Sequence, residues 1–361
     1  MKYHAALAHF PKMTYSRYKK LAAYFSDFKN LWDAELADLA KAGIEENIAH
    51  EFLMWRDQNP TDGIMERLEK EGITTVSINE PGYPALLKEI SDPPHTLFVR
   101  GNLPANGTPS LGVVGTRKLT NYGRYACEEI IKPLAKSGVV IVSGLALGID
   151  GIAHQTALDS NGITIAVLGS GIDRQHVYPS VHKHLAESII NKGGAIISEY
   201  PPGFLPTHYS FPARNRIIAG LTLGTLVIEA PEISGALITA RCALDYNREV
   251  FAVPHNINSP TGDGPNNLIK MGAKLVTNAS DIAEALNLKA LTDTIDNRAE
   301  TQASNPTEAK ILQSLSAEPK HIDTLIKETE LPSQVITSVL TLMEIKGKVR
   351  NWGGMTYTIN K

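Results

Sequence analysis

The sequence predicts an α/β fold: a Rossmann-like, mostly parallel sheet preceded by a helical domain and followed by a winged-helix domain. Between residues 71 and 288, short β-branched runs alternate with helical segments, as in parallel sheets that helices cover on both faces. Residues 1–70 instead space their apolar positions as helices do. Residues 307–361 give three helical segments and then two strand-like runs. The polar stretch 289–306, between this region and the sheet domain, is expected to be a linker.

The helical region, residues 1–70, contains FPKMTYSRYKKL, which resembles the first hairpin of a helix-hairpin-helix or SAM-like module. This hairpin has no glycine whose exposed amides could bind a phosphate. Both DNA binding and packing or partner contact stay open for this domain, and the second is favoured.

Seven apolar runs predict the strands of the central domain: LGVVGTR, VVIVSGLA, ITIAVLGSG, AIISEY, GTLVIEA, EVFAVPH and AKLVTN. Ligands of such sheets bind beyond the carboxyl ends of the strands, where glycine, serine and arginine gather in this chain. We expect the first three of these loops to lie side by side and to present backbone amides to an anion. Tight strand-to-helix turns need glycine even when nothing binds, so each loop alone is weak support.

The C-terminal helices and strand pair predict a winged helix. Its third helix offers Ser333, Gln334, Thr337, Ser338 and Thr341 to solvent, without a lysine or arginine before residue 346. A helix that reads DNA would carry basic or amide side chains there, so protein contact is favoured over DNA contact.

The composition, 43% hydrophobic and 20% charged residues, is typical of a globular protein, and no apolar run approaches the ~18 residues of a membrane span. The first residues lack the apolar core and cleavage site of a secretion signal, so we expect a cytoplasmic protein. Cys127 and Cys242 lie in helical segments and are expected to be reduced thiols.

Basic residues are concentrated in two stretches without acidic side chains. Residues 93–127 include Arg117, and residues 200–228 include Arg214 and Arg216. Together they indicate an anion site, although stretches without acidic residues also arise by chance.

The loops carry no GxGxxG after the first run and no GxxxxGK[ST], so neither dinucleotide binding nor ATP hydrolysis is supported. The histidines show no metal-ligand spacing, and we expect no metal and no cofactor. Asp150 and His154, four residues apart, could perform acid/base chemistry, but a helix-capping aspartate and a packed histidine explain them more simply.

Several motifs together carry a resemblance to a known family. They are GVVGTRKLTNYG, SGLALGIDGIAH, TIAVLGSGID followed by YP, ISEYPPG, FPARNRIIAGL, SGALITA and EVFAVPHNINSPTGDGPNNLIKMGA. This set resembles the DNA-processing protein A (DprA/Smf) family. The resemblance implies a bacterial homodimer that binds and protects incoming single-stranded DNA and loads the recombinase RecA onto it in natural transformation, with no enzymatic activity.

The resemblance also implies a positively charged DNA pocket. Matched residue by residue, it consists of Gly115, Thr116, Arg117, Ser143, Gly144, Gly169, Ser170, Gly171, Phe211, Arg214, Asn215 and Arg216.

Arg117 and Arg214 are expected to be exposed phosphate contacts. Helical positions two apart point to nearly opposite sides, so Arg214 and Arg216 cannot both face one pocket if the helix is regular there. A buried pair of Arg216 with Glu229 is the alternative for that residue. Phe211 either stacks on a base or belongs to the core.

Two other function classes stay open. GTLVIEA followed by SGALITA faintly resembles nucleoside monophosphate phosphoribohydrolases of the lysine-decarboxylase-like type, but their PGGxGT signature is absent. A structural adaptor with an empty pocket is the third possibility.

Overall fold

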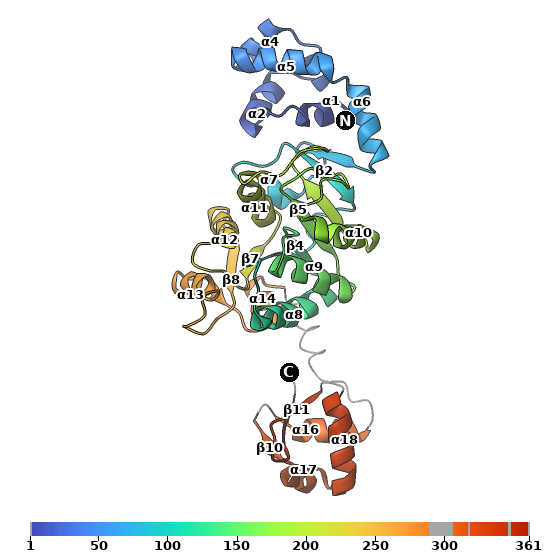
Figure 1. Cartoon of the computed structure of the whole chain (residues 1–361), viewed down its shortest axis with the longest axis vertical. Coiled ribbons are helices and arrows are strands. Elements are labelled where there is room, and N and C mark those ends of the chain that lie inside the picture. The colour runs from blue at the N-terminus through green and yellow to red at the C-terminus, as the bar shows by residue number, and fades with distance from the viewer. Residues whose placement is uncertain (1, 289–305, 317, 346–347, 360–361) are drawn as a thin grey trace. The chain divides into compact units, whose positions relative to one another are not determined.

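The computed structural model describes residues 2–288, 306–316, 318–345 and 348–359 (Figure 1). The chain divides into two compact units, Met1–Leu288 and Lys289–Lys361, and each is described by itself. Within the described ranges, no helix is both long enough and apolar enough to cross a membrane.

The first unit begins with six helices, as the apolar spacing predicts. They are α1 (Lys2–Ala8), α2 (Tyr15–Tyr24), α3 (Phe28–Trp32), α4 (Leu36–Lys41), α5 (Glu46–Gln58) and α6 (Thr61–Lys70). Thr14 caps α2 by accepting a hydrogen bond from the Arg17 amide, and Asp27 caps α3 in the same way. His9 packs edge-on against Phe98 of the sheet, with the ring centroids 5.2 Å apart.

A nine-stranded sheet follows, in the order β1-β2-β6-β5-β4-β3-β7-β8-β9. β2 runs antiparallel to both of its neighbours, β1 and β6, and all other neighbouring strands of this sheet are parallel. The strands are β1 (Thr74–Ser77), β2 (Thr96–Gly101), β3 (Ser110–Val114), β4 (Val140–Ser143), β5 (Thr164–Leu168), β6 (Ala195–Ser198), β7 (Gly224–Val227), β8 (Glu249–Ala252) and β9 (Lys274–Leu275). All seven predicted runs form strands, β3 to β9, and the mostly parallel Rossmann-like sheet is confirmed.

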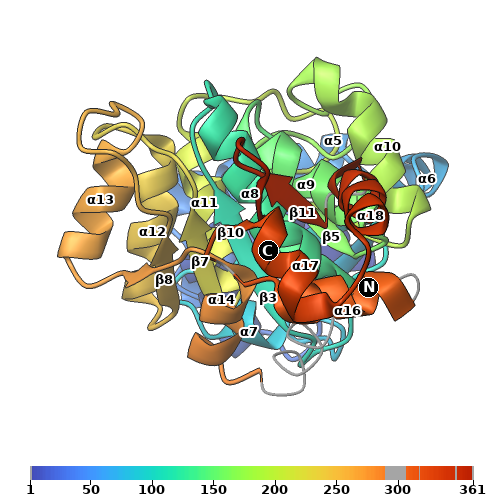
Figure 2. The same cartoon turned by 90° about the horizontal axis from the view of Figure 1, so that it is seen from below.

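Helices cover this sheet. They are α7 (Ala85–Lys88), α8 (Asn121–Lys136), α9 (Ile149–Asp159), the 3-10 turn η1 (Ser180–His182), α10 (Lys183–Asn191), α11 (Ser210–Gly220), α12 (Gly235–Asp245), α13 (Asp263–Lys270) and α14 (Ala279–Ala285). The green helices α8 and α10 both pack against α9, and the yellow helices α11 and α12 form a second group (Figure 2). Cys127 is buried and Cys242 half-buried, both as free thiols.

The strand order reverses at β3, because β4 lies on one side of it and β7 on the other. The loops that follow β3 and β7 therefore diverge and leave a crevice at the carboxyl ends of these strands. The fold alone places a ligand site there.

The second unit is a small winged helix, as predicted. It comprises α16 (Pro306–Ser314), β10 (Lys320–His321), α17 (Ile322–Thr329), α18 (Ser333–Ile345), β11 (Val349–Asn351) and β12 (Thr356–Ile359), with the sheet order β10-β12-β11. Ile311, Leu325, Ile336, Leu340 and Met343 are fully buried in its core. Residues 289–305 of the predicted linker lie outside the described residues.

Candidate functional site

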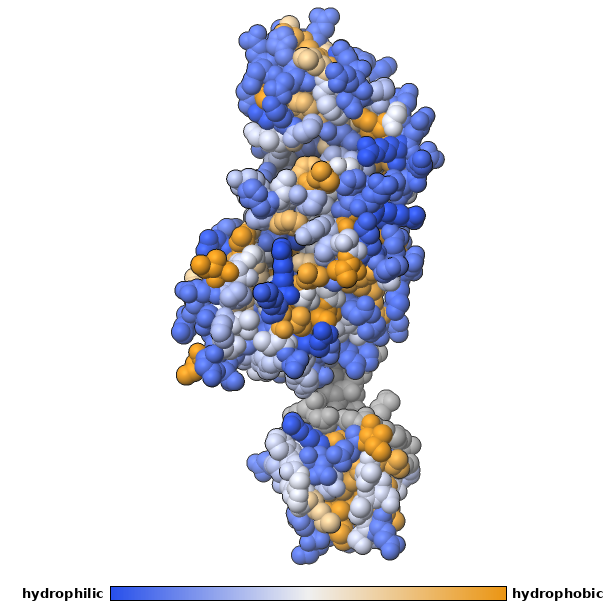
Figure 3. All heavy atoms as spheres, viewed as in Figure 1, coloured by the Kyte–Doolittle hydropathy of each residue, from blue (hydrophilic) through white to orange (hydrophobic). Residues whose placement is uncertain are grey.

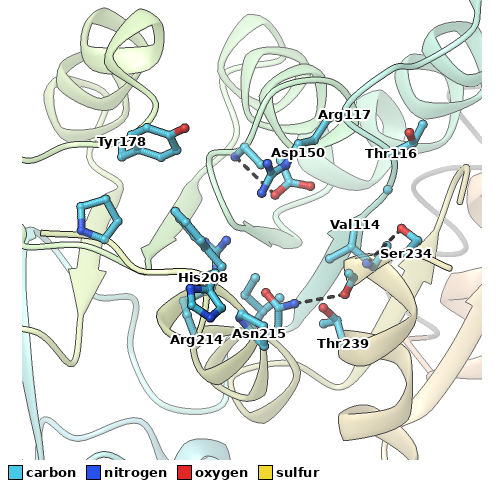
Figure 4. Close-up of a pocket in the computed structure, with 18 of the residues that line it drawn as sticks. Val114, Thr116, Arg117, Asp150, Tyr178, His208, Arg214, Asn215, Ser234 and Thr239 are labelled. Carbon is cyan, nitrogen blue, oxygen red and sulfur yellow. Dashed lines mark hydrogen bonds between the residues drawn. The ribbon is translucent and has the colours of Figure 1, made fainter.

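A pocket of about 690 Å³ opens at the carboxyl ends of β3 and β7, where the strand order predicts a crevice (Figure 4). Its lining comes from the loop after β3, the loop after β4 with the start of α9, the loop after β5 at Tyr178, the segment before α11, α11 itself and the first turns of α12. Of the residues predicted for the site, six line this pocket: Gly115, Thr116, Arg117, Phe211, Arg214 and Asn215.

The loop after β3 is fixed by contacts with the end of β7. A Cβ atom on Gly115 would lie 2.5 Å from the Ile149 side chain, so only glycine fits. The Thr116 amide donates to the Glu229 carbonyl at 2.7 Å. The buried Glu229 carboxylate accepts hydrogen bonds from the Thr120 amide (2.9 Å) and the Thr120 hydroxyl (2.6 Å). These bonds position the loop that carries Arg117.

Arg117 is exposed and faces aromatic rings. Its guanidinium carbon lies 5.8 Å from the centre of the Phe211 ring, and the Tyr178 ring lies 5.6 Å from the same ring. No carboxylate of the described residues pairs with it. A cation next to two rings can bind a phosphate while a base stacks on the rings.

Arg214 differs from the prediction, because its side chain is buried and only 5% of it is exposed. Its Nη1 donates to the Gly144 carbonyl at 2.6 Å and to the Val167 carbonyl. A Cβ atom on Gly144 would lie 2.4 Å from Nη1, so a larger residue would displace the Arg214 guanidinium. Burial lowers the pKa of Arg214 to about 10, which still leaves it charged at neutral pH. The expectation of an exposed Arg214 is wrong. Its guanidinium group donates to the carbonyl of Gly144, just after β4, and to that of Val167, near the end of β5.

His154 is packed as the simpler explanation predicts, but Asp150 does not cap α9, because the N-cap is Gly148 and no side chain caps this helix. The Asp150 carboxylate accepts hydrogen bonds from the Gly144 and Ala146 amides, at 3.1 Å and 3.4 Å, and burial raises its pKa. His154 is fully buried, and its Nδ1 lies 2.7 Å from the Thr164 hydroxyl. Because that hydroxyl donates to the Ile141 carbonyl, the His154 Nδ1 is the donor of the pair. Burial lowers the pKa of His154 to about 3, so it remains neutral.

The predicted surface of free loop amides is not observed. The amides of Thr116 and Gly144 are bonded within the protein, and the Gly171 amide donates to the Phe204 carbonyl at 2.8 Å. Ser143 and Ser170 are buried, and their hydroxyls donate to the carbonyls of Val113 and Gly171.

The glycines of the second and third loops serve close packing instead. A Cβ atom on Gly169 would meet Phe211 at 2.9 Å, and one on Gly171 would meet the Phe204 amide at 2.9 Å. Of the predicted residues in the second and third loops, Gly144 alone borders a small extension of the pocket, beside Leu147 and Tyr178.

Arg216 lies on the opposite side of α11 from the pocket. Its Nη2 lies 2.6 Å from Glu199 and its Nε 3.5 Å from Asp92. The proposed pair with Glu229 is therefore wrong, since threonine side chains and the Thr120 amide bind that carboxylate. The helical-phase argument is confirmed: Arg214 and Asn215 face the pocket, and Arg216 does not.

Two family models match this sequence. The first, described as DNA recombination-mediator protein A, covers residues 74–287, and the second, the DprA winged helix domain, covers residues 296–355. The chain belongs to the DNA recombination-mediator protein A family.

Relatives and solved structures of the DNA recombination-mediator protein A family resemble the chain over different lengths. Protein Smf of Synechocystis is 34% identical, with 94% of each chain covered. Protein Smf of Escherichia coli is 47% identical over 61% of this chain but only 58% of its own length. The crystal structure of DNA processing protein A from Streptococcus pneumoniae matches with a TM-score of 0.68 and 37% identity, covering 79% of this chain and 97% of that one.

A second solved family member is DNA processing protein A from Helicobacter pylori. It matches with a TM-score of 0.53 and 30% identity, covering 60% of this chain and 96% of its own. Its structure is described as giving insight into a single-stranded DNA binding mode.

The residue-by-residue prediction missed Tyr178, His208 and the start of α12, which also line the pocket. The sequence held a signal for the last, because Ser234 before an apolar helical run is a helix-cap pattern. Tyr178 is 49% exposed. Such exposure does not single it out, because other apolar side chains also interrupt the hydrophilic surface of this unit (Figure 3). A single exposed tyrosine has no sequence signature, so only the fold reveals its place beside Phe211.

Proposed function

We propose that this protein binds single-stranded DNA through the pocket and acts in recombination by loading RecA onto that DNA. The observation that carries the proposal is the exposed Arg117, which pairs with no carboxylate of the described residues and lies beside the Phe211 and Tyr178 rings. Family membership supports it, as does the single-stranded DNA named for the Helicobacter pylori relative.

Single strands suit this site better than duplex DNA. The two rings can stack only on bases that are not already stacked in a helix. The pocket is a hollow bordered by loops, by one side of α11 and by the start of α12, which is not the shape of a protruding helix that enters a major groove. We therefore expect binding with little sequence preference.

The wider role follows from the family resemblance. It comprises protection of incoming single-stranded DNA in natural transformation, a homodimeric state and a cytoplasmic location. Binding rather than catalysis is supported by Asp150 and His154, because both are buried and bonded within the protein.

Fluorescence anisotropy with a labelled oligo-dT strand and a blunt duplex of the same length tests the proposal. We expect the strand to bind at least tenfold more tightly, a difference of ~1.4 kcal/mol. Equal affinity for the duplex would contradict it. Release of a free base or ribose phosphate from a nucleoside monophosphate would instead favour the phosphoribohydrolase alternative.

A further inference from the structure

The N-terminus of α12 presents an unused donor at the pocket wall. The Ser234 hydroxyl caps the helix by accepting from the Ala236 amide at 3.3 Å, and the Leu237 amide donates to the Ser234 carbonyl at 3.1 Å. The amide of Gly235, the first helical residue, has no acceptor among the described residues. It lies at the positive end of an 11-residue helix, where an anion is favoured.

A buried hydroxyl one turn further along points to a ligand independently. Thr239 is 1% exposed and lines the pocket, and its Oγ1 has no partner within the described part of the chain. A helical threonine ordinarily bonds to the carbonyl four residues back, here that of Gly235. That carbonyl instead accepts from the Asn215 side chain at 3.1 Å, so the Thr239 hydroxyl is left for another acceptor.

The space around this helix end is open. A Cβ atom added to Gly235 would meet no atom within 4 Å. Residues four apart share one face of a helix, so Gly235 and Thr239 border the same part of the pocket. Ser234 and Thr239 lie across the pocket from Tyr178 in Figure 4.

We propose that the Gly235 amide and the Thr239 hydroxyl bind a phosphate group of single-stranded DNA, other than the phosphate that Arg117 contacts. This inference rests on the proposed function. A phosphate accepts hydrogen bonds from both groups, and the positive helix end favours its charge and disfavours a cation. A DNA strand bound through one phosphate at Arg117 and through another at α12 would run past the Phe211 and Tyr178 rings, which lie between these two contacts.

A matched pair of substitutions isolates the amide. Gly235→Pro removes only the N–H, because proline is well tolerated at the first helical position. The preceding Ser234 is extended, with φ −144° and ψ 143°, which is the conformation that a following proline requires. Gly235→Ala keeps the N–H and adds its methyl group to open space. Thr239→Val removes the hydroxyl at nearly constant volume.

The readout is oligo-dT affinity of the full-length protein at several salt concentrations. We expect Gly235→Pro to weaken binding about fivefold relative to Gly235→Ala, the effect of one hydrogen bond, without changing the salt dependence. Thr239→Val should weaken it by a similar factor, and this variant decides the matter if Gly235→Pro fails to fold.

The possible failures are distinguishable. If the unsubstituted protein binds and Arg117→Ala weakens binding, but Gly235→Pro and Thr239→Val bind normally, the α12 site is overturned and the proposed function survives. If the unsubstituted protein does not bind oligo-dT, the proposed function itself fails. Competition by dTMP tests for a free nucleotide: loss of dTMP binding in Gly235→Pro with unchanged oligo-dT affinity would overturn the assignment to DNA.

Discussion

Arg117 and Arg214 line the same pocket, but the first is exposed and has no ion pair within the described ranges, while the second is buried and bonded to backbone carbonyls. We call Gly144, Asp150 and Arg214 the floor of the pocket, and Arg117, Tyr178 and Phe211 its rim. The floor residues are buried and bond to one another and to nearby backbone groups, so their removal should cost folding free energy. The rim has unused charge and ring surface, so its removal should cost binding.

The difference teaches that a basic residue in a binding pocket is not by itself a ligand contact. Arg214 still contributes positive potential from below, because burial leaves it charged at neutral pH. Its Nη1 nevertheless donates to the Gly144 and Val167 carbonyls, whereas no described acidic side chain pairs with Arg117.

Substitution of the buried arginine should have the largest effect. Arg214→Ala leaves two carbonyls and the Asp150 carboxylate without their cation, which costs about 3–5 kcal/mol of unfolding free energy. Arg117→Ala should change stability by less than about 0.5 kcal/mol. Urea unfolding monitored by circular dichroism measures both, and equal stability of the two variants would remove the distinction between floor and rim.

Substitution of the rim phenylalanine should come next. Phe211→Ala is expected to cost ~1–3 kcal/mol of oligo-dT binding if the ring stacks on a base. Phe211→Leu is the control, since it keeps apolar volume but loses the ring face, and it should bind nearly as weakly as the alanine variant. Full affinity of Phe211→Leu would show that Phe211 serves only packing. The salt dependence should be unchanged in both variants.

Acid should destabilise the protein through His154, which lies one turn beyond Asp150 on α9. Its pKa is about 3 in the folded state and about 6.5 when unfolded, so the unfolded state binds the extra proton as pH falls below 6.5. This histidine alone should remove about 1 kcal/mol of stability between pH 6.5 and 5.5. Unfolding titrations should show a flatter pH dependence for His154→Asn and an unchanged one for Arg117→Ala; a parallel profile for His154→Asn would refute the assignment.

Removal of the winged helix should have the smallest effect on binding. A chain that ends at Asn287 keeps the whole pocket, because every residue that lines it belongs to the first unit. We expect its oligo-dT affinity to fall by less than tenfold, or ~1.4 kcal/mol. A larger loss in a fragment that is folded by circular dichroism would assign DNA contacts to the second unit.

Much of the fold could be predicted from the sequence, because local patterns determine it. The apolar runs of β3 to β7 have no polar face to expose, so they form buried parallel strands. The opposite directions of Arg214 and Arg216 likewise followed from helical geometry alone.

The division between floor and rim could not be predicted, because it depends on contacts between distant segments. Arg214 is buried only because α11 packs beside the loop at Gly144, 70 residues earlier in the chain. In the same way, the loop amides looked free until the fold placed Asp150, Phe204 and the Glu229 carbonyl against them.

The most direct test of the account is the salt dependence of oligo-dT binding by Arg117→Ala, measured beside the unsubstituted protein. Each phosphate neutralised on a single strand contributes ~0.7 to the slope of log affinity against log salt concentration. The account predicts a slope smaller in magnitude by about that amount, weaker binding and an unchanged melting temperature. If Arg117→Ala is folded and keeps both the affinity and the slope of the unsubstituted protein, the DNA does not bind at this rim and the central claim is contradicted.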